Sequence, residues 1–373
     1  MLYIVNSCFK PNTAPTNRVL ALLKGFDEVG VDAELVLLYP SVNCDRVDKE
    51  LFHCIEIKHL WDKRKNHNKL YKYLCSFIDA KRFAKSLKEG DKVLLFGSSE
   101  FAHIFTQRKG INVYQERTEH PSVNPLELTY MQKKYIKTIP SFAGMFTISY
   151  GLKRAMEGYG AKNVHVINML VDHSRFNGLV KTTDEKYIAY CGTASNNKDG
   201  VDDLIKAFAI VAKKYPEVRL KIMGESPSKD DESGNLKLVE SLGLQKQVEF
   251  TGIIKAQDMP QMLKNAAIVA LARPDSLQAQ CGFPTKLGEY LLSENPVVVT
   301  KVGDIPLFLR DKETALLSSE RNPEAFASKL SWVFEHPEEA KEIGCKGARV
   351  AMKEFNYRTE AKKMIDVLLE EKQ

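Results

Sequence analysis

The chain has 373 residues, of which 44% are hydrophobic and 27% charged, and its net charge is +6. This length and composition exclude a disordered or fibrous protein and predict a two-domain globular one. The first apolar run, LYIV, is too short for a secretory signal, and no later run reaches the length that spans a bilayer. Seven cysteines without paired spacing argue against a disulfide framework or a zinc site, so a cytoplasmic location is expected.

Apolar runs alternate with helix-length amphipathic stretches through the first half of the chain. The apolar runs are LYIV, AELVLL, KVLLFG, NVYQ, GMFTIS and NVHVINML. This alternation is typical of parallel strands joined by crossover helices. It predicts a first α/β domain over residues 1–177, built on a Rossmann-like parallel sheet.

A polar stretch, DHSRFNGLVKTTDEK, follows Val171 and is predicted to be the linker. The pattern then restarts with YIAYCG, RLKIMG, VEFTG, AIVALA and PVVVT, with helical segments such as 202–214 and 257–265. A second Rossmann-like domain is therefore expected over residues 178–356, and the final helix, 357–373, is expected to pack back on the first domain. Because ligands of such sheets bind at the carboxyl ends of the strands, the two domains are predicted to face a central cleft.

The segment CGFPTKLGEYLLSENPVVVTKVGDIP, residues 281–306, places a helix between two buried strands. The helix is predicted to run from Thr285 to residue 293, with its N-terminus at the carboxyl end of the preceding strand. Gly282 allows close backbone approach to a ligand, Pro284 suits a helix start, and Thr285 can cap it. Exposed amides there would bind an anion, and Glu289, one turn further on, would accept hydrogen bonds from a ribose diol. The segment therefore predicts a site for a nucleoside diphosphate.

Longer segments carry a resemblance to a known family. YCGTASNNKDGVDDLIKAFAIVAKKYPEVRLKIMGE and VEFTGIIKAQDMPQMLKNAAIVALARPDSLQAQCGFPTKLGEYLLSENPVVVTKVGDIPLFLRDKETALL make residues 187–320 resemble the donor domain of family-four retaining glycosyltransferases, which have the GT-B fold. QERTEHP and FTISYGLKRAMEGYGAKNVHVINMLVDHSRF are similar to that family's acceptor-domain landmarks. The resemblance implies transfer from a UDP- or GDP-sugar to a glycan or lipid-linked acceptor, in surface polysaccharide or glycoconjugate synthesis, without a metal or other cofactor.

Two positions depart from the family pattern. The family has two glutamates spaced E-x7-E, and Cys281 stands at the first position. Thr193 stands where the family has an arginine, whereas Lys198 is kept. Donor-sugar contacts are therefore expected to rest more on the backbone near Gly282 or on Gln280, and Lys286 is expected to supply the missing charge.

The resemblance also implies the site residues. The catalytic set is His120, Lys198 and Glu289, and the donor-binding set is Gly192, Thr193, Lys198, Gly282, Phe283, Pro284, Thr285, Lys286 and Glu289. His120 is expected to hydrogen-bond the donor sugar, although a lone histidine is more often structural. The alternative interpretations are solvated surface lysines at Lys198 and Lys286 and an ordinary helix residue at Glu289, and the functional interpretation is favoured at Lys198 and Glu289. Glu116, Glu119 and Cys191 are left without a catalytic role.

The implied mechanism is metal-independent retention. The chain offers no Asp-x-Asp triplet, so charge developing on the leaving diphosphate would be met by helix amides, Lys198 and Lys286. The family resemblance implies a front-face route in which the leaving phosphate takes the acceptor proton.

Two other classes of protein are alternatives to a glycosyltransferase. A dehydrogenase of similar alternation would have G-x-G-x-x-G after the first strand, where this chain has VNSCFKPNTAPTN. A nucleotide-sugar-binding protein without transfer activity stays open, because Cys281 and Thr193 depart from the family pattern at the site itself.

Positive charge is concentrated in the first domain. Residues 1–177 carry 26 lysines and arginines against 18 aspartates and glutamates, and many of these basic residues lie in KHLWDKRKNHNKLYKYLCSFIDAKRFAKSLK, residues 58–88. The apolar residues recurring among them at partly helical spacing are Trp61, Leu70, Tyr73, Leu74 and Phe77. The segment is either a helix that packs this stripe on the sheet or a membrane-surface helix. A basic face favours an anionic acceptor used at the inner membrane face, and no motif accompanies the charge that would favour nucleic acid.

Overall fold

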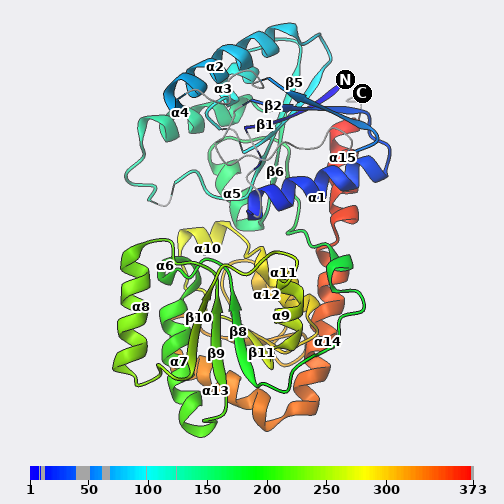
Figure 1. Ribbon diagram of the computed structural model, residues 1–373. Coiled ribbons are helices and arrows are strands. Elements are labelled where there is room, and N and C mark those ends of the chain that lie inside the picture. Colours follow the sequence, from blue (N-terminus) through cyan, green and yellow to red (C-terminus); the bar gives the residue numbers. More distant parts are fainter. Residues whose placement is uncertain are drawn as a thin grey trace. The chain divides into compact units, whose positions relative to one another are not determined.

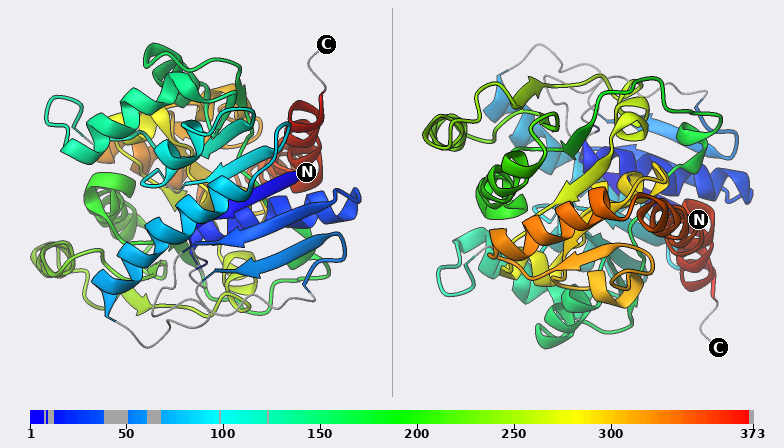
Figure 2. Two further views of the ribbon diagram at one scale, coloured as in Figure 1. Left: turned by 90° about the horizontal axis from the view of Figure 1, so that it is seen from above. Right: turned by 90° about the horizontal axis from the view of Figure 1, so that it is seen from below.

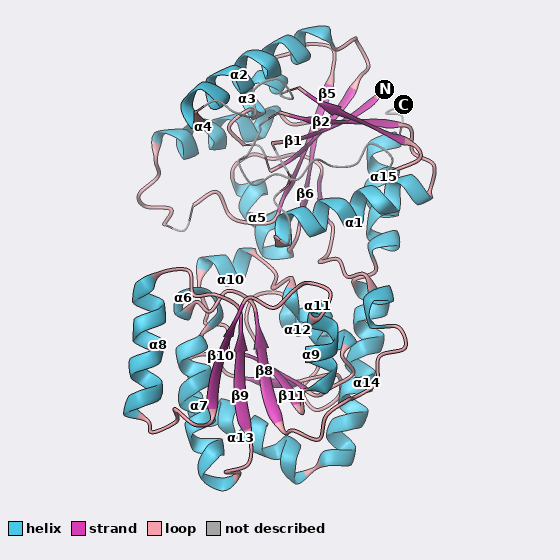
Figure 3. Cartoon of the chain, in the orientation of Figure 1, coloured by secondary structure: helices cyan, strands magenta, loops and turns pink. Residues whose placement is uncertain are grey.

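The computed structural model describes residues 1–7, 9, 13–38, 51–60, 68–97, 99–122 and 124–370. The chain divides into two compact units, one of Met1–Leu170 with Tyr357–Gln373 and one of Val171–Asn356. Each unit is an α/β structure around one parallel sheet, which confirms the predicted fold class (Figures 1 and 3). The division falls earlier than the predicted boundary after residue 177, because Val171 bridges to Asn356 and its N–H donates to the Phe355 carbonyl at 2.9 Å.

The sheet of the first unit has seven strands in the described part of the chain, in the order β3-β2-β1-β4-β5-β6-β7. The strands are β1 Leu2–Asn6, β2 Ala33–Leu37, β3 Ile55–His59, β4 Lys92–Phe96, β5 Asn112–Arg117, β6 Gly144–Thr147 and β7 Val164–Val166. The helices are α1 Ala14–Glu28, α2 Lys69–Ser86, α3 Ala102–Thr106, α4 Tyr130–Thr138, α5 Tyr150–Gly158 and α15 Tyr357–Leu369, with the 3₁₀ turn η2 Ile139–Ser141. The strand order reverses between β1 and β4, which is where ligands of such sheets bind.

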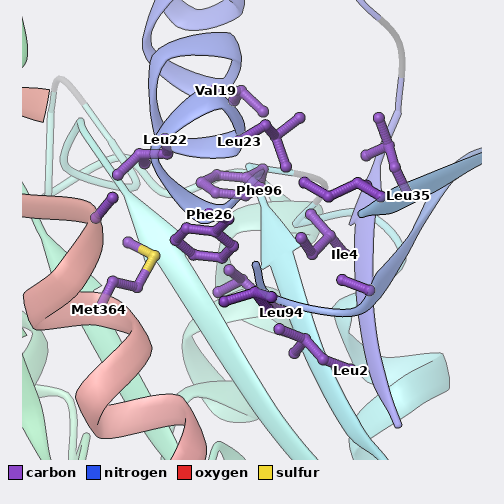
Figure 4. Packing of buried hydrophobic residues seen from close by; sticks show 14 of the residues in the cluster. Leu2, Ile4, Val19, Leu22, Leu23, Phe26, Leu35, Leu94, Phe96 and Met364 are labelled. Carbon is purple, nitrogen blue, oxygen red and sulfur yellow. The ribbon is translucent and has the colours of Figure 1, made fainter. Parts of the chain in front are cut away.

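Helix α1 shows how the sequence pattern forms the first core. Val19, Leu22, Leu23 and Phe26 follow one another at three- and four-residue spacing, so they share one helix face. All four are buried. The strand residues in the same cluster include Ile4, Leu35, Leu94 and Phe96 (Figure 4).

Helix α15 belongs to the first unit although it comes last in the sequence. Met364 and Leu368 are buried in the same cluster as α1 (Figure 4). The two helices lie side by side (Figures 1 and 2) and approach closely, since a Cβ on Gly25 would lie 2.4 Å from the Ala361 Cβ. A glycine at residue 25 is what permits this approach.

The sheet of the second unit has six strands in the order β10-β9-β8-β11-β12-β13. The strands are β8 Tyr187–Cys191, β9 Arg219–Met223, β10 Val248–Gly252, β11 Ile268–Leu271, β12 Val297–Thr300 and β13 Leu316–Ser318. The helices are α6 Asn196–Asp199, α7 Val201–Lys214, α8 Lys229–Ser241, α9 Met259–Asn265, α10 Leu277–Cys281, α11 Lys286–Leu292, α12 Ile305–Phe308, α13 Pro323–Glu335 and α14 Pro337–Glu354, with the 3₁₀ turn η3 His173–Phe176. Here the order reverses between β8 and β11, so the turn after β8 lies at the expected ligand-binding edge.

The basic segment of residues 58–88 is only partly described. Trp61 lies outside the described residues, and α2 accounts for residues 69–86. The apolar residues of this segment do not all pack on the sheet, as one of the two interpretations expected. Leu70, Leu74 and Tyr73 are exposed. Phe77 is half-buried against Phe101, at 4.8 Å between ring centroids. No helix in the described ranges is long and apolar enough to cross a bilayer.

Candidate functional site

The turn that follows β8 is shaped by glycine. Gly192 has φ of 141°, a conformation that L side chains rarely adopt. A Cβ at this position would lie 2.3 Å from the Lys286 Nζ. The Gly192 N–H donates to the Met223 carbonyl at 2.8 Å. The turn is therefore held against β9 while its backbone lies directly beside the Lys286 ammonium.

Lys286 is paired with a buried carboxylate beneath this turn. Its Nζ lies 2.5 Å from Asp199 Oδ2 and 3.0 Å from the Tyr190 hydroxyl. The Tyr190 hydroxyl lies in turn 2.5 Å from the Thr193 carbonyl oxygen and 2.9 Å from Asp199 Oδ2. The network joins the turn, α6 and the start of α11 into one polar cluster.

The pKa shifts follow from this burial and pairing. Burial lowers the pKa of Lys286, and Asp199 offsets part of that effect. Burial alone would raise the pKa of Asp199, but the Lys286 charge and hydrogen bond outweigh it, so the carboxyl pKa is lowered. The pair is thus ionised, and the Lys286 charge is balanced by Asp199. This balance differs from the unpaired charge that the sequence led us to expect at Lys286.

The end of β8 is fixed by a tyrosine from α11. The Tyr290 hydroxyl donates to the Cys191 carbonyl at 2.7 Å and accepts from the Cys191 N–H at 2.7 Å. Burial raises the pKa of the Cys191 thiol to about 12, and Glu289 adds to the effect. A thiol that stays protonated is a poor nucleophile, so Cys191 serves packing.

Glu289 forms an ion pair that the sequence did not predict. Its Oε1 pairs with Arg175 Nη1, and Arg175 Nη2 donates to the Ala256 carbonyl at 2.6 Å. The two side chains keep 29% and 32% of their surface exposed, respectively. Burial raises the pKa of Glu289, and the Arg175 charge opposes this. Arg175 therefore holds a half-exposed carboxylate in one orientation.

The Gly-Phe-Pro turn before α11 is buried. Phe283 packs against Phe308 and Phe355, each at 5.5 Å between ring centroids. The Gly282 N–H donates to the Gln278 carbonyl at 2.8 Å, so this amide is already engaged. Pro284 is buried, and the predicted side-chain cap is not formed, because Thr285 is itself in the helical conformation with φ of −59° and ψ of −26°.

Lys198 and His120 lie in different units. Lys198 is exposed in α6, directly before Asp199, and its N–H donates to Ser195 Oγ at 3.2 Å. His120 is half-buried in the first unit, with Nδ1 2.7 Å from the Ser122 carbonyl oxygen and Nε2 3.2 Å from the Tyr159 hydroxyl. The structure thus brings Gly192, Thr193 and Lys286 together with Asp199. His120 belongs to the first unit and this cluster to the second.

Four residues of this cluster were missed by the sequence reasoning: Arg175, Asp199, Tyr190 and Tyr290. Asp199 directly follows the predicted site residue Lys198, and this nearness was the one signal that could have indicated it. Arg175 lies in the polar stretch that was predicted to be the linker, so nothing in the sequence indicated it. The described ranges contain no group of three or more histidine, cysteine, aspartate or glutamate side chains that could hold a metal ion.

Residues 185–336 match the family model described as glycosyl transferases group 1. Over this part, the chain is similar to the group 1 glycosyltransferases. The mannosylfructose-phosphate synthase of Agrobacterium fabrum is 23% identical over 367 residues, covering 89% of this chain and 76% of that protein. The D-inositol 3-phosphate glycosyltransferase of Corynebacterium glutamicum is 26% identical over 162 residues, covering 43% of this chain and 37% of that protein.

Solved structures extend the likeness to the whole chain. HepE of Anabaena in complex with UDP-glucose has a TM-score of 0.75 and 16% identity, covering 99% of both chains. Sucrose-phosphate synthase of Thermosynechococcus elongatus has a TM-score of 0.76 and 15% identity, covering 98% of both chains. These likenesses confirm the GT-B fold.

Proposed function

We propose that the chain transfers a sugar from a nucleoside diphosphate sugar to a glycan or lipid-linked acceptor, with retention of configuration, in surface polysaccharide or glycoconjugate synthesis. One observation carries the proposal: a glycine turn, a buried lysine and an arginine-oriented glutamate gather at the carboxyl end of β8. HepE was solved with UDP and with UDP-glucose, which supports such a donor.

Glu289 is assigned to the ribose hydroxyls of the donor. A carboxylate has two oxygens and about four acceptor sites, so its pairing with Arg175 leaves capacity for a diol. Arg175 would keep the carboxylate in place as donor binds.

Lys198 is assigned the larger share of the leaving diphosphate's charge. It is exposed beside the glycine turn, whereas Asp199 balances the Lys286 charge. In the proposed front-face step, the acceptor oxygen bonds to the anomeric carbon as the bond to the diphosphate oxygen breaks. The acceptor proton passes to that phosphate oxygen.

The direct test is to incubate the protein with a panel of nucleoside diphosphate sugars, each together with glycan and lipid-linked acceptors, and to measure released nucleotide, with EDTA or with added Mg²⁺. We expect release with at least one donor, and we expect EDTA not to abolish it, because cationic side chains are available for the leaving group. No release from any donor that binds would overturn transfer.

A second candidate is a protein that binds nucleotide sugar without transferring it. Cys281, where the family has a glutamate, is buried at the end of α10, and a thiol cannot hold a sugar hydroxyl as a carboxylate does. Donor binding without release of nucleotide, with any acceptor supplied, would favour this candidate.

His120 is proposed to contact the transferred sugar. His120→Ala should then reduce turnover far more than affinity for the nucleoside diphosphate, because its contact is with the transferred group. Steady-state kinetics and calorimetry with UDP measure the two effects. Tyr159→Phe, which removes only the 3.2 Å contact to Nε2, is the control and should cost less. Equal loss of turnover and affinity in His120→Ala would mean a structural role.

We also propose that α2 contacts an anionic membrane surface. Leu70, Leu74 and Ile78 are 69%, 55% and 49% exposed and recur every four residues, so they form one outward stripe. Lys81, Arg82 and Lys85 continue it, and none of the exposed residues described on α2 is acidic. An apolar stripe followed by basic residues suits the interface of an anionic leaflet.

A further inference from the structure

The first unit contains a small cavity beside the loop that carries His120. Its volume is about 110 Å³, and it lies between the loop after β4, α3, the end of β5 and α4. The polar side chains that line it include Ser99, Glu100, His103, Arg117, Gln132 and Lys134. Pro121, the residue after His120, also lines it.

The charges around this cavity are mostly positive. Arg117 and Lys134 form no ion pair with any carboxylate among the described residues. Glu100 is the one acidic side chain in the lining, and its Oε1 accepts a hydrogen bond from Ser7 Oγ at 3.1 Å. His103 is half-buried, and burial followed by the Lys134 charge lowers its pKa. Two cations without a carboxylate partner, beside a half-buried histidine, are suited to an anionic ligand.

Arg117 is held in position by groups that leave part of its donor capacity unused. Its guanidinium lies 5.0 Å from the centroid of the Tyr135 ring, and Nη2 donates to the Glu119 carbonyl at 3.2 Å. The Tyr135 hydroxyl is fixed by Gln115 at 2.5 Å. Arg117 Nε is buried and donates to no described residue. A buried donor without a partner calls for a ligand or water to satisfy it.

A larger cavity of about 260 Å³ adjoins this one through Arg117, which lines both. Asn6, Gly97, Thr118 and Glu119 line the larger cavity, at the edge where the strand order reverses between β1 and β4. Its amide, hydroxyl and carboxylate groups suit the hydroxyls of a sugar or polyol. The smaller cavity has room for only a few heavy atoms, since a water occupies about 30 Å³.

We propose that the smaller cavity binds the phosphate group of a phosphorylated acceptor, with its polyol body in the larger cavity. This rests on the proposed transfer, because it names the class of acceptor. The Arg117 guanidinium donates to two phosphate oxygens in a fork, and Lys134 adds a point charge. The phosphate belongs either to a soluble sugar phosphate or to a lipid phosphate.

The test is calorimetric titration of the full chain with inorganic phosphate at low salt. Lys134→Gln should weaken phosphate binding about tenfold or more, the cost of a lost charged hydrogen bond. Lys137→Gln removes the same charge from an exposed position on α4 that does not line the cavity, so it should bind phosphate as the parent does. Because Arg117 also stacks on Tyr135, Lys134 is the variant less prone to misfolding.

Two further measurements separate this proposal from the proposed function. Lys134→Gln should bind UDP-glucose as tightly as the parent protein does. If neither protein binds UDP-glucose, that result counts against the proposed transfer and not against the phosphate site. Displacement of phosphate by a hexose phosphate or by a short-chain prenyl phosphate identifies the source of the acceptor. No binding of inorganic phosphate by the parent protein, or equal binding by Lys134→Gln and Lys137→Gln, would overturn the proposal.

Discussion

Lys286 and Asp199 are the residues on which the turn after β8 depends most. The Asp199 side chain is 3% exposed, so removing its partner would leave a buried charge uncompensated. Lys286→Met should therefore lower the free energy of unfolding by about 3–5 kcal/mol. Replacing both residues, as Lys286→Met with Asp199→Leu, should cost much less than the sum of the two single changes.

Urea unfolding of the four proteins in this cycle measures the coupling. The exposed pair between Lys186 and Glu217 serves as the control, and breaking it should cost about 1 kcal/mol or less. Additive effects at Lys286 and Asp199 would show that the two side chains do not stabilise one another.

Glu289 governs donor affinity if it holds the ribose. Glu289→Ala should weaken binding of the nucleoside diphosphate sugar by about 2–4 kcal/mol, the scale for losing hydrogen bonds to a charged group. Calorimetry with the donor found in the panel gives the value. Glu240→Ala, an exposed glutamate on α8, is the matched control. The assignment fails if Glu289→Ala and Glu240→Ala bind the donor equally.

The sequence could not predict which residues pair with one another at the site. Gly192, Lys286 and Glu289 were predicted as site residues because their types and spacing around strand ends are informative. Their partners were not, since Lys286 and Asp199 are 87 positions apart and Arg175 and Glu289 are 114 apart. A single sequence holds no signal for pairing over such separations, so the charge balance at Lys286 could only come from the structure.

At the scale of elements, helix α15 is tied to α1 by a carboxylate. Glu28 accepts from the Tyr357 hydroxyl at 2.8 Å and from Arg358 Nε at 2.7 Å. Burial alone would raise the Glu28 pKa, but the hydrogen bonds from Arg358 and Tyr357 outweigh it and lower the pKa below 4.5. Because the folded-state pKa is the lower one, this stabilisation is fully present above about pH 4.5 and is lost as pH falls through the folded-state value.

Glu28→Gln should therefore lower the Tm at pH 7, and the difference from the parent protein should shrink as the pH falls below about 4.5. Thermal unfolding followed by circular dichroism across this range measures it. Glu56→Gln, an exposed glutamate on β3, is the control and should change the Tm little at any of these pH values. A Tm difference that stays constant down to pH 3 would contradict the predicted role of the Glu28 carboxylate.

The strands that the sequence did not predict, β3 and β13, are both edge strands, whereas the other two edge strands, β7 and β10, were predicted. The central strands are continuous apolar runs because helices cover both of their faces, and these runs were recognised. Strand β3 alternates buried and exposed residues in IEIKH, and β13 has only three residues. Such short or half-polar edge strands resemble loops in a single sequence. The helix predicted from Thr285 to residue 293 was found as α11, but its expected cap was not.

At the scale of the whole molecule, part of the positive charge of residues 1–177 lies on the exposed face of α2. Two interpretations of the apolar residues in the basic segment were open, and exposure argues against a stripe packed on the sheet in the described part. The buried face of α2 is formed by Lys72, Ser76, Asp79, Ala80 and Phe83. The sequence stripe at Leu70 and Leu74 lies on the outside instead, because a helix phase cannot be fixed when apolar residues occur on both faces.

Co-sedimentation with vesicles tests whether this outward stripe meets a membrane. We expect the protein to bind vesicles containing phosphatidylserine at low salt, to bind them less at raised salt, and not to bind phosphatidylcholine vesicles, since each basic residue near an anionic surface contributes about 1 kcal/mol. Leu74→Ser with Ile78→Ser should weaken binding by removing exposed apolar area. Ile210→Ser, at a residue 41% exposed on α7, is the matched control and should have no effect. If anionic vesicles are not bound at low salt, a soluble acceptor becomes the better hypothesis. If Leu74→Ser with Ile78→Ser instead converts a dimer to a monomer in sedimentation velocity, the stripe is an interface between copies of the chain.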